Sequence, residues 1–164
     1  MQENLNRLLS TPPGVAVFSA TFVIFFVVVW CFVCLVISLL GGWFALSRRF
    51  AKQSEPLGET RTAGPFFYKV CMRFWGNYSS VIRLTAAGDA LYPSVLFPFR
   101  FGHPPLRIPW NEITVGTTRR FFRNWLVLTL GNEERIPMRI PERMARKLGL
   151  FERFPALAPY SPSQ

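Results

Sequence analysis

A long apolar run dominates the N-terminal part of the chain. Between Val15 and Leu40, 26 consecutive residues carry no charged side chain. A helix of that length would measure about 39 Å, more than the roughly 30 Å of hydrocarbon in a bilayer. The pattern predicts a single transmembrane helix, to which we assign residues 14–46, preceded by a short extracytoplasmic tail over residues 1–13.

The charges on the two sides of this run differ. Glu3 and Arg7 precede it and cancel, whereas Arg48, Arg49 and Lys52 follow it closely. Basic flanks are retained in the cytoplasm, so we expect the N-terminus outside and the C-terminal part inside. A secretory signal peptide has its positive charge ahead of a shorter apolar core, so we expect this helix to remain on the mature protein.

A line of mostly small residues follows the predicted helix at alternating spacings of four and three. Helices in lipid associate where small residues let their backbones approach, so this line, hereafter the seam, predicts a docking face for another helix. The alternative is that any long apolar run contains some small residues at helical spacing. Because the two cysteines of the seam have no nearby His or carboxylate, we expect no metal there. The seam consists of Ala20, Ile24, Val27, Cys31, Cys34, Ser38 and Gly41.

The remainder of the chain changes character twice. Residues 47–64 mix charge with Gly, Pro, Ser and Thr and predict a linker. Residues 65–154 predict one small cytoplasmic domain, and the Pro- and Ser-rich residues 155–164 a disordered tail. Within the domain, runs rich in β-branched and aromatic residues alternate with turn formers and predict about seven strands. These runs are Phe66–Phe74, Ser80–Thr85, Ala90–Leu96, Leu106–Ile108, Ile113–Thr118, Trp125–Leu130 and Arg135–Ile140.

The end of the domain predicts a short helix. Residues 141–148 begin with a proline, carry a carboxylate in the first turn and cations in the last, and meet Gly149. Pro137 lies within a predicted strand, which we therefore expect at a sheet edge or a bulge. The predicted fold class is α+β: one N-terminal transmembrane helix and a small antiparallel β domain closed by a short C-terminal helix.

Two phrases of the sequence carry a resemblance to known families. VIRLTAAGDALY (residues 81–92) and LRIPWNEITV (residues 106–115), followed by further strands and a helix, resemble bacterial pleckstrin-homology-like and GRAM-like domains. FRFGHPPLRIPWNEI (residues 99–113) resembles a phrase of uncharacterised small bacterial membrane proteins with the form FRxGHPPLxIPWxxI. The resemblance implies a PH-like β domain and the bacterial inner (cytoplasmic) membrane, and it transfers no phosphoinositide motif.

The side chains that catalysis usually employs are scarce. The chain has one histidine, His103, which lies in a Gly-His-Pro-Pro loop where it could serve as an acid or base or could fix the loop through a backbone carbonyl. We expect the structural role, no catalytic residue and no cofactor. Trp110 is expected to anchor the core, and Glu112 to pair with an arginine such as Arg107 or to cap a turn.

Charge is the stronger functional signal. The chain has 19 Lys and Arg against 9 Asp and Glu, a formal net charge of +10, all of it after the apolar run. Each basic residue near an anionic bilayer contributes ~1 kcal/mol of attraction. Arginines interleaved with large aromatics suit lipid headgroups or a protein surface, and we expect no nucleic acid. The predicted contact residues are Arg48, Arg49, Lys52, Phe99, Arg100, Arg119, Arg120, Phe121, Phe122, Arg123 and Trp125.

These patterns lead to one main hypothesis and two alternatives. The main hypothesis is a non-enzymatic single-pass membrane subunit, an accessory or scaffold that packs its helix against an integral membrane protein or a larger complex. The first alternative is a membrane-tethered module that binds anionic lipid headgroups. The second is an enzyme that uses His103, and self-association of the helix stays open beside all three.

Overall fold

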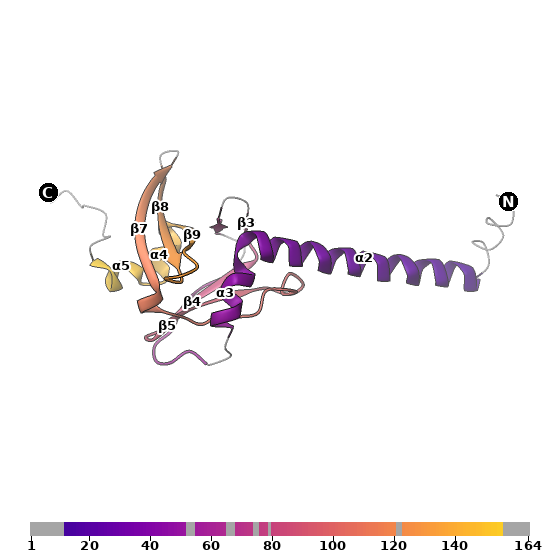
Figure 1. Ribbon diagram of the computed structural model, residues 1–164, viewed down its shortest axis with the longest axis horizontal. Helices are drawn as coiled ribbons and strands as arrows, with labels where there is room; N and C mark the ends of the chain where they lie inside the picture. Colours follow the sequence, from indigo (N-terminus) through magenta and orange to yellow (C-terminus); the bar gives the residue numbers. More distant parts are fainter. Residues whose placement is uncertain are drawn as a thin grey trace.

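One long helix projects from a small β domain in the computed structural model (Figure 1). The structure describes residues 12–51, 55–64, 68–73, 76–78, 80–120 and 123–155. Helix α2 covers Pro12–Gly41, and within it the segment Gly14–Gly41 is long and apolar enough to cross a membrane. Most of its side chains are exposed because no other part of the described chain surrounds them. The α+β class that the sequence predicts is confirmed at this level.

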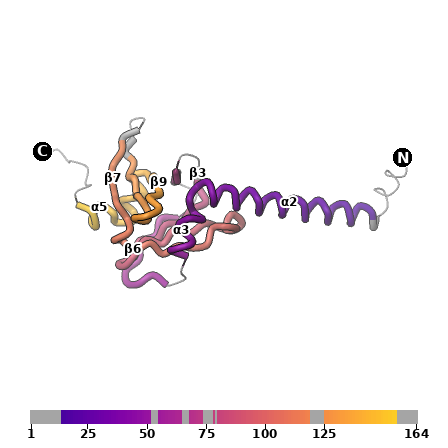
Figure 2. Tube along the Cα trace, viewed as in Figure 1, coloured from indigo at the N-terminus to yellow at the C-terminus, as the bar shows by residue number. Residues whose placement is uncertain are grey.

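The chain turns sharply after α2 (Figure 2). Gly42 adopts a left-handed conformation, with φ 83°, and starts a second helix, α3, over Trp43–Phe50. Glycine takes this conformation without the steric cost that a Cβ would bring. The sequence predicts one helix over residues 14–46 and a linker over residues 47–64. Instead, Trp43, Leu46 and Phe50, spaced three and four apart, are buried in the domain.

The domain consists of two antiparallel sheets. One has the order β1-β4-β5-β6 and the other β3-β2-β9-β8-β7. The first contains β1 (Arg61–Ala63), β4 (Ile82–Ala86), β5 (Ala90–Val95) and β6 (Ile108–Pro109). The second contains β2 (Cys71–Met72), β3 (Gly76–Asn77), β7 (Ile113–Arg120), β8 (Arg123–Leu130) and β9 (Ile136–Pro141). A 3₁₀ turn η1 (Trp110–Glu112) joins the sheets, and α4 (Glu142–Lys147) and α5 (Leu150–Arg153) follow β9.

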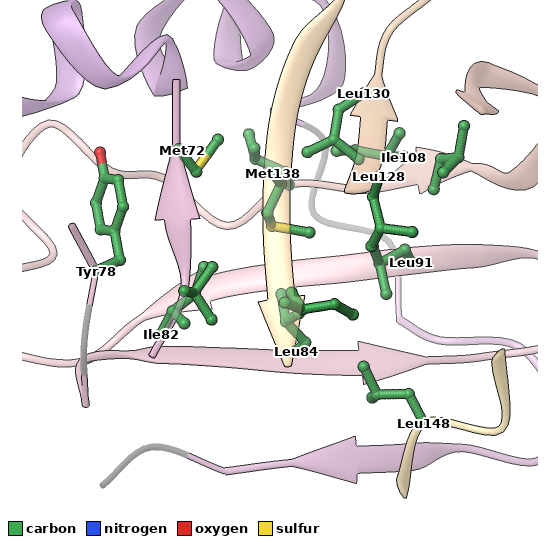
Figure 3. Close-up of a cluster of buried hydrophobic side chains, with 14 of the residues drawn as sticks. Met72, Tyr78, Ile82, Leu84, Leu91, Ile108, Leu128, Leu130, Met138 and Leu148 are labelled. Carbon is green, nitrogen blue, oxygen red and sulfur yellow. The ribbon is translucent and has the colours of Figure 1, made fainter. Parts of the chain in front are cut away.

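Alternate side chains of the strands form one core between the sheets. Met138 of β9 lies opposite Met72 of β2 and Leu128 of β8, and Figure 3 shows these residues facing Leu84 and Leu91 of the other sheet. All five are at most 1 % exposed. Burial of alternate positions is what a sheet with one wet face requires, and it confirms the period that the sequence showed in these strands.

The prediction for Pro137 is wrong. Strand β9 lies inside its sheet, paired with β2 on one side and β8 on the other. Strand β2 is only two residues long and pairs with Met138 and Arg139. Pro137, which has no N–H to donate, therefore lies beyond the end of β2. The Pro137 carbonyl accepts the Arg73 amide at 3.0 Å. The proline therefore interrupts no ladder bond.

Candidate functional site

The segment between β5 and β6 folds back along α2. We call residues 96–105 the β5–β6 loop, and Figure 1 shows it beside the C-terminal part of α2. Three side chains of the helices donate hydrogen bonds to its carbonyl oxygens. They run from Trp30 Nε1 to Pro98 at 3.4 Å, from Ser38 Oγ to Gly102 at 2.5 Å and from Trp43 Nε1 to Pro104 at 2.9 Å. The loop is thus joined to α2 at two points about two turns apart, Trp30 and Ser38, and to α3 at Trp43.

A buried aromatic cluster completes this junction. The His103 ring lies 5.4 Å from the Trp43 ring and 5.4 Å from the Tyr78 ring, between centroids, and its side chain is 2 % exposed. Its Nδ1 lies 2.9 Å from the Phe101 carbonyl oxygen, which can only accept, so Nδ1 carries the proton. Nε2 then accepts the Tyr78 hydroxyl at 3.0 Å. Both ring nitrogens are engaged, which favours the loop-fixing role over acid–base chemistry.

The seam is divided between two environments. Cys34 and Ser38 are buried, and Ser38 binds the β5–β6 loop through Gly102. Gly41 is covered by Tyr78, whose Oη would lie 2.7 Å from a Cβ at that position. Cys31 is half-buried. Ala20, Ile24 and Val27 remain exposed. The C-terminal part of the predicted docking face is therefore occupied by the chain itself, and only the N-terminal part is open to another helix.

The basic residues after α2 have separate roles. Arg48 is exposed, whereas Arg49 pairs with Glu112 at 2.8 Å and lies 3.5 Å from Glu133. Glu112 also accepts the Asn132 amide at 2.9 Å, so it caps the turn between β8 and β9 as expected. The arginine partner differs from the one we named, because Arg107 pairs with Asp89 at 2.9 Å. The Arg49 contacts join α3 to η1 and to the turn between β8 and β9.

The remaining predicted contact residues are exposed, half-buried or outside the described part of the chain. Phe99 and Arg100 are exposed in the β5–β6 loop, and Trp125 is half-buried in β8. Trp110, expected in the core, is half-buried, and its Nε1 donates to the Ala87 carbonyl at 2.9 Å. Lys52, Phe121 and Phe122, and the side chains of Arg119, Arg120 and Arg123, lie outside the described residues.

Apart from the junction, a concave surface lies between β1, β4 and α5. It is an open groove of about 490 Å³ lined by Arg61, Glu152, Arg153 and neighbouring backbone. Arg61 pairs with Glu152 at 2.7 Å, and Arg153 donates to the Gly88 carbonyl and stacks 4.5 Å over the Trp110 ring. Its arginines are committed to partners within the chain, so the groove is a weaker candidate for a ligand than the junction.

No protein-family model, curated protein or solved structure matches this chain. Within the described residues, no group of three His, Cys, Asp or Glu side chains is placed to hold a metal ion. The junction between α2 and the β domain, in which long-range polar contacts, buried aromatics and exposed loop side chains meet, is the candidate functional site.

Because His103 is buried at the junction, we expect the folded protein to lose stability in acid. Burial lowers the pKa of His103 below its usual 6.5, against the opposing effect of the Phe101 and Phe99 carbonyls. A histidine whose folded pKa is depressed contributes stability that is complete above the unfolded value and is lost as the pH falls through the folded value. We expect the thermal unfolding midpoint of the detergent-purified protein to fall as the pH drops below the usual histidine pKa of about 6.5.

His103→Gln separates this effect from the titration of carboxylates. The amide keeps polar atoms in the loop but does not titrate, so the variant should be less stable at neutral pH and show a shallower loss of stability on acidification. Equal slopes in the wild type and the variant would show that His103 is not the titrating group.

Proposed function

We propose that this protein is a non-enzymatic single-pass protein of the bacterial inner membrane, an accessory or scaffold subunit that holds a small basic domain at a fixed orientation to its membrane helix. The observation that carries the proposal is the junction. Trp30, Ser38 and Trp43 bind the β5–β6 loop over a stretch of helix that a simple tether would leave free. A fixed orientation serves a protein that positions partners, whereas a flexible linker serves one that only needs to remain near the membrane.

The exposed part of the seam supports a helical partner. Ala20, Ile24 and Val27 form one face of α2, and the described chain leaves that face open. Close approach at a small residue such as Ala20 is the usual basis of helix association in lipid. The orientation we propose, with the N-terminus outside, follows from the basic flank that includes Arg48 and Arg49.

Purification of the tagged protein in a mild detergent, followed by native gel and mass spectrometry, tests this proposal. We expect a membrane protein to co-purify in a fixed ratio. Ala20→Phe with Val27→Phe should reduce its recovery, because two large rings block close approach. Val15→Phe with Val29→Phe is the matched control, since both residues are exposed and lie on the other side of the helix at 3.6 residues per turn. Recovery of the monomer alone from the wild type would count against a subunit role.

The second candidate function is binding of anionic headgroups. It is supported by the formal charge of +10, all of it after the apolar run. The purified protein should then prefer vesicles that contain phosphatidylglycerol, and the preference should weaken as salt screens the charges.

A further inference from the structure

The β5–β6 loop exposes large apolar side chains next to the apolar surface of α2. Phe97 is 87 % exposed and Phe101 59 %, and Phe99 packs on Trp30 with 5.0 Å between ring centroids. A loop of a water-soluble domain seldom presents three phenylalanines within five residues. Here they continue the apolar surface of the helix, on which Leu35 and Leu39 are also exposed.

Many backbone groups of this loop have hydrogen-bond partners within the protein. The carbonyl oxygens of Leu96 and Arg100 accept the amides of Phe99 and His103, each at 2.9 Å. The Phe101 carbonyl accepts the His103 ring, and side chains of α2 and α3 reach three further carbonyls of the loop. The residues at 98, 104 and 105 are prolines and have no N–H to satisfy. Non-helical backbone at membrane depth is tolerated where its polar groups are buried in protein, and these bonds pair six carbonyl oxygens of the loop with protein groups, those of residues 96, 98, 100, 101, 102 and 104.

The length of α2 determines where the loop lies. From Pro12 to Val29, ahead of the Trp30 contact, the helix rises only about 27 Å, less than the roughly 30 Å of hydrocarbon in a bilayer. A bilayer that begins at the start of α2 therefore reaches Trp30 and the loop residues against it, and tilting the helix brings them deeper. Ending the membrane before Trp30 would leave the exposed Leu35 and Leu39 in water.

We propose that the β5–β6 loop is immersed in the cytoplasmic leaflet beside α2, with Phe97 and Phe101 against lipid acyl chains and Arg100 reaching back to the phosphates. This inference rests on the proposed membrane-spanning role of α2. Trp30 and Phe99 then lie near the boundary of the hydrocarbon, the level that aromatic rings prefer. A long basic side chain such as Arg100 reaches the headgroups from an immersed backbone. The domain would be held by two membrane contacts instead of one, which fixes its height and its rotation about the helix.

Spin labelling of the full-length protein tests the depth of the loop. In a background with Cys31→Ala, Cys34→Ala and Cys71→Ala, a nitroxide is placed at Phe97→Cys, and the protein is reconstituted in vesicles of phosphatidylethanolamine and phosphatidylglycerol. Collisions with oxygen report lipid, and collisions with a water-soluble nickel chelate report the aqueous phase. Phe25→Cys in the middle of α2 is the lipid reference, and Leu57→Cys, 66 % exposed on the domain, is the aqueous reference. An unchanged unfolding midpoint shows that each labelled protein is folded.

We expect the label at position 97 to behave like that at position 25, with oxygen collisions exceeding nickel collisions, and the label at 57 to show the reverse. Strong nickel collisions at 97 would place the loop in water and overturn the inference. Weak collisions with both reagents would show that protein covers the loop, as a second copy would, and would also overturn it. If alkaline carbonate extracts the protein from the vesicles, the proposed membrane-spanning role itself fails.

Discussion

Replacing Trp43 with alanine is expected to lower the free energy of unfolding by about 3–5 kcal/mol, the usual cost of emptying a large aromatic site in a core. Trp43 is the first residue of α3 and is 0 % exposed. Its ring packs 5.8 Å from that of Tyr78, and its Nε1 holds the Pro104 carbonyl at 2.9 Å. The substitution therefore removes buried surface and also releases one attachment of the β5–β6 loop.

Denaturant unfolding in a mild detergent, followed by circular dichroism, measures the effect. Phe44→Ala is the matched control, because Phe44 is the next residue of the same helix and is 46 % exposed. Its cost should stay within about 0.5 kcal/mol, as for other surface sites. Trypsin gives a second measure, since loss of α3 would open the bond after Arg48. If both variants were equally stable, the junction would not depend on Trp43.

The start of a separate helix at Trp43 is a feature that the sequence did not predict. The strands around Leu84, Leu128 and Met138 were predictable because each buries alternate residues against one core, a local pattern. The break at Gly41-Gly42 had a local signal too, a glycine pair, which marks turns. The sequence nevertheless predicts one continuous helix, because the hydropathy of the preceding run continues through the pair. The strand β1 at Arg61–Ala63 had no such signal, because only Ala63 of its three residues is buried.

Only part of the candidate site could be predicted from the sequence, because its contacts join residues that are far apart in the chain. The spacing of the seam predicts a docking face for another helix, and that stays a prediction. What approaches its C-terminal part is the β5–β6 loop, and Ser38 and Gly102 are 64 residues apart. No local pattern contains a pairing at that separation. The phenylalanines at 97, 99 and 101 in a region without regular structure were a signal, but only Phe99 is among the predicted contact residues, and no local pattern places it against α2.

Gly41→Leu is expected to break the junction from the helix side, with a cost of about 2–5 kcal/mol that combines overpacking with the loss of a buried hydrogen bond. Gly41 lies within α2, and a Cβ there would meet Tyr78 Oη at 2.7 Å and its ring carbons at 3.3 and 3.4 Å. Tyr78 is 3 % exposed and has little room to withdraw. Displacing it would leave His103 Nε2 without its donor.

The sequence places Gly41 on the predicted docking face for another helix, and the structure gives a substitution there a different meaning. Because the same surface carries the chain's own junction, loss of a partner in this variant would follow from a disturbed domain. Ala20→Leu is the informative comparison, since Ala20 lies on the exposed part of the seam and its replacement should leave the unfolding midpoint unchanged. A normal midpoint for Gly41→Leu would mean that Tyr78 can move aside, and the rigid coupling of helix to domain would then have to rest on Trp30, Ser38 and Trp43 alone.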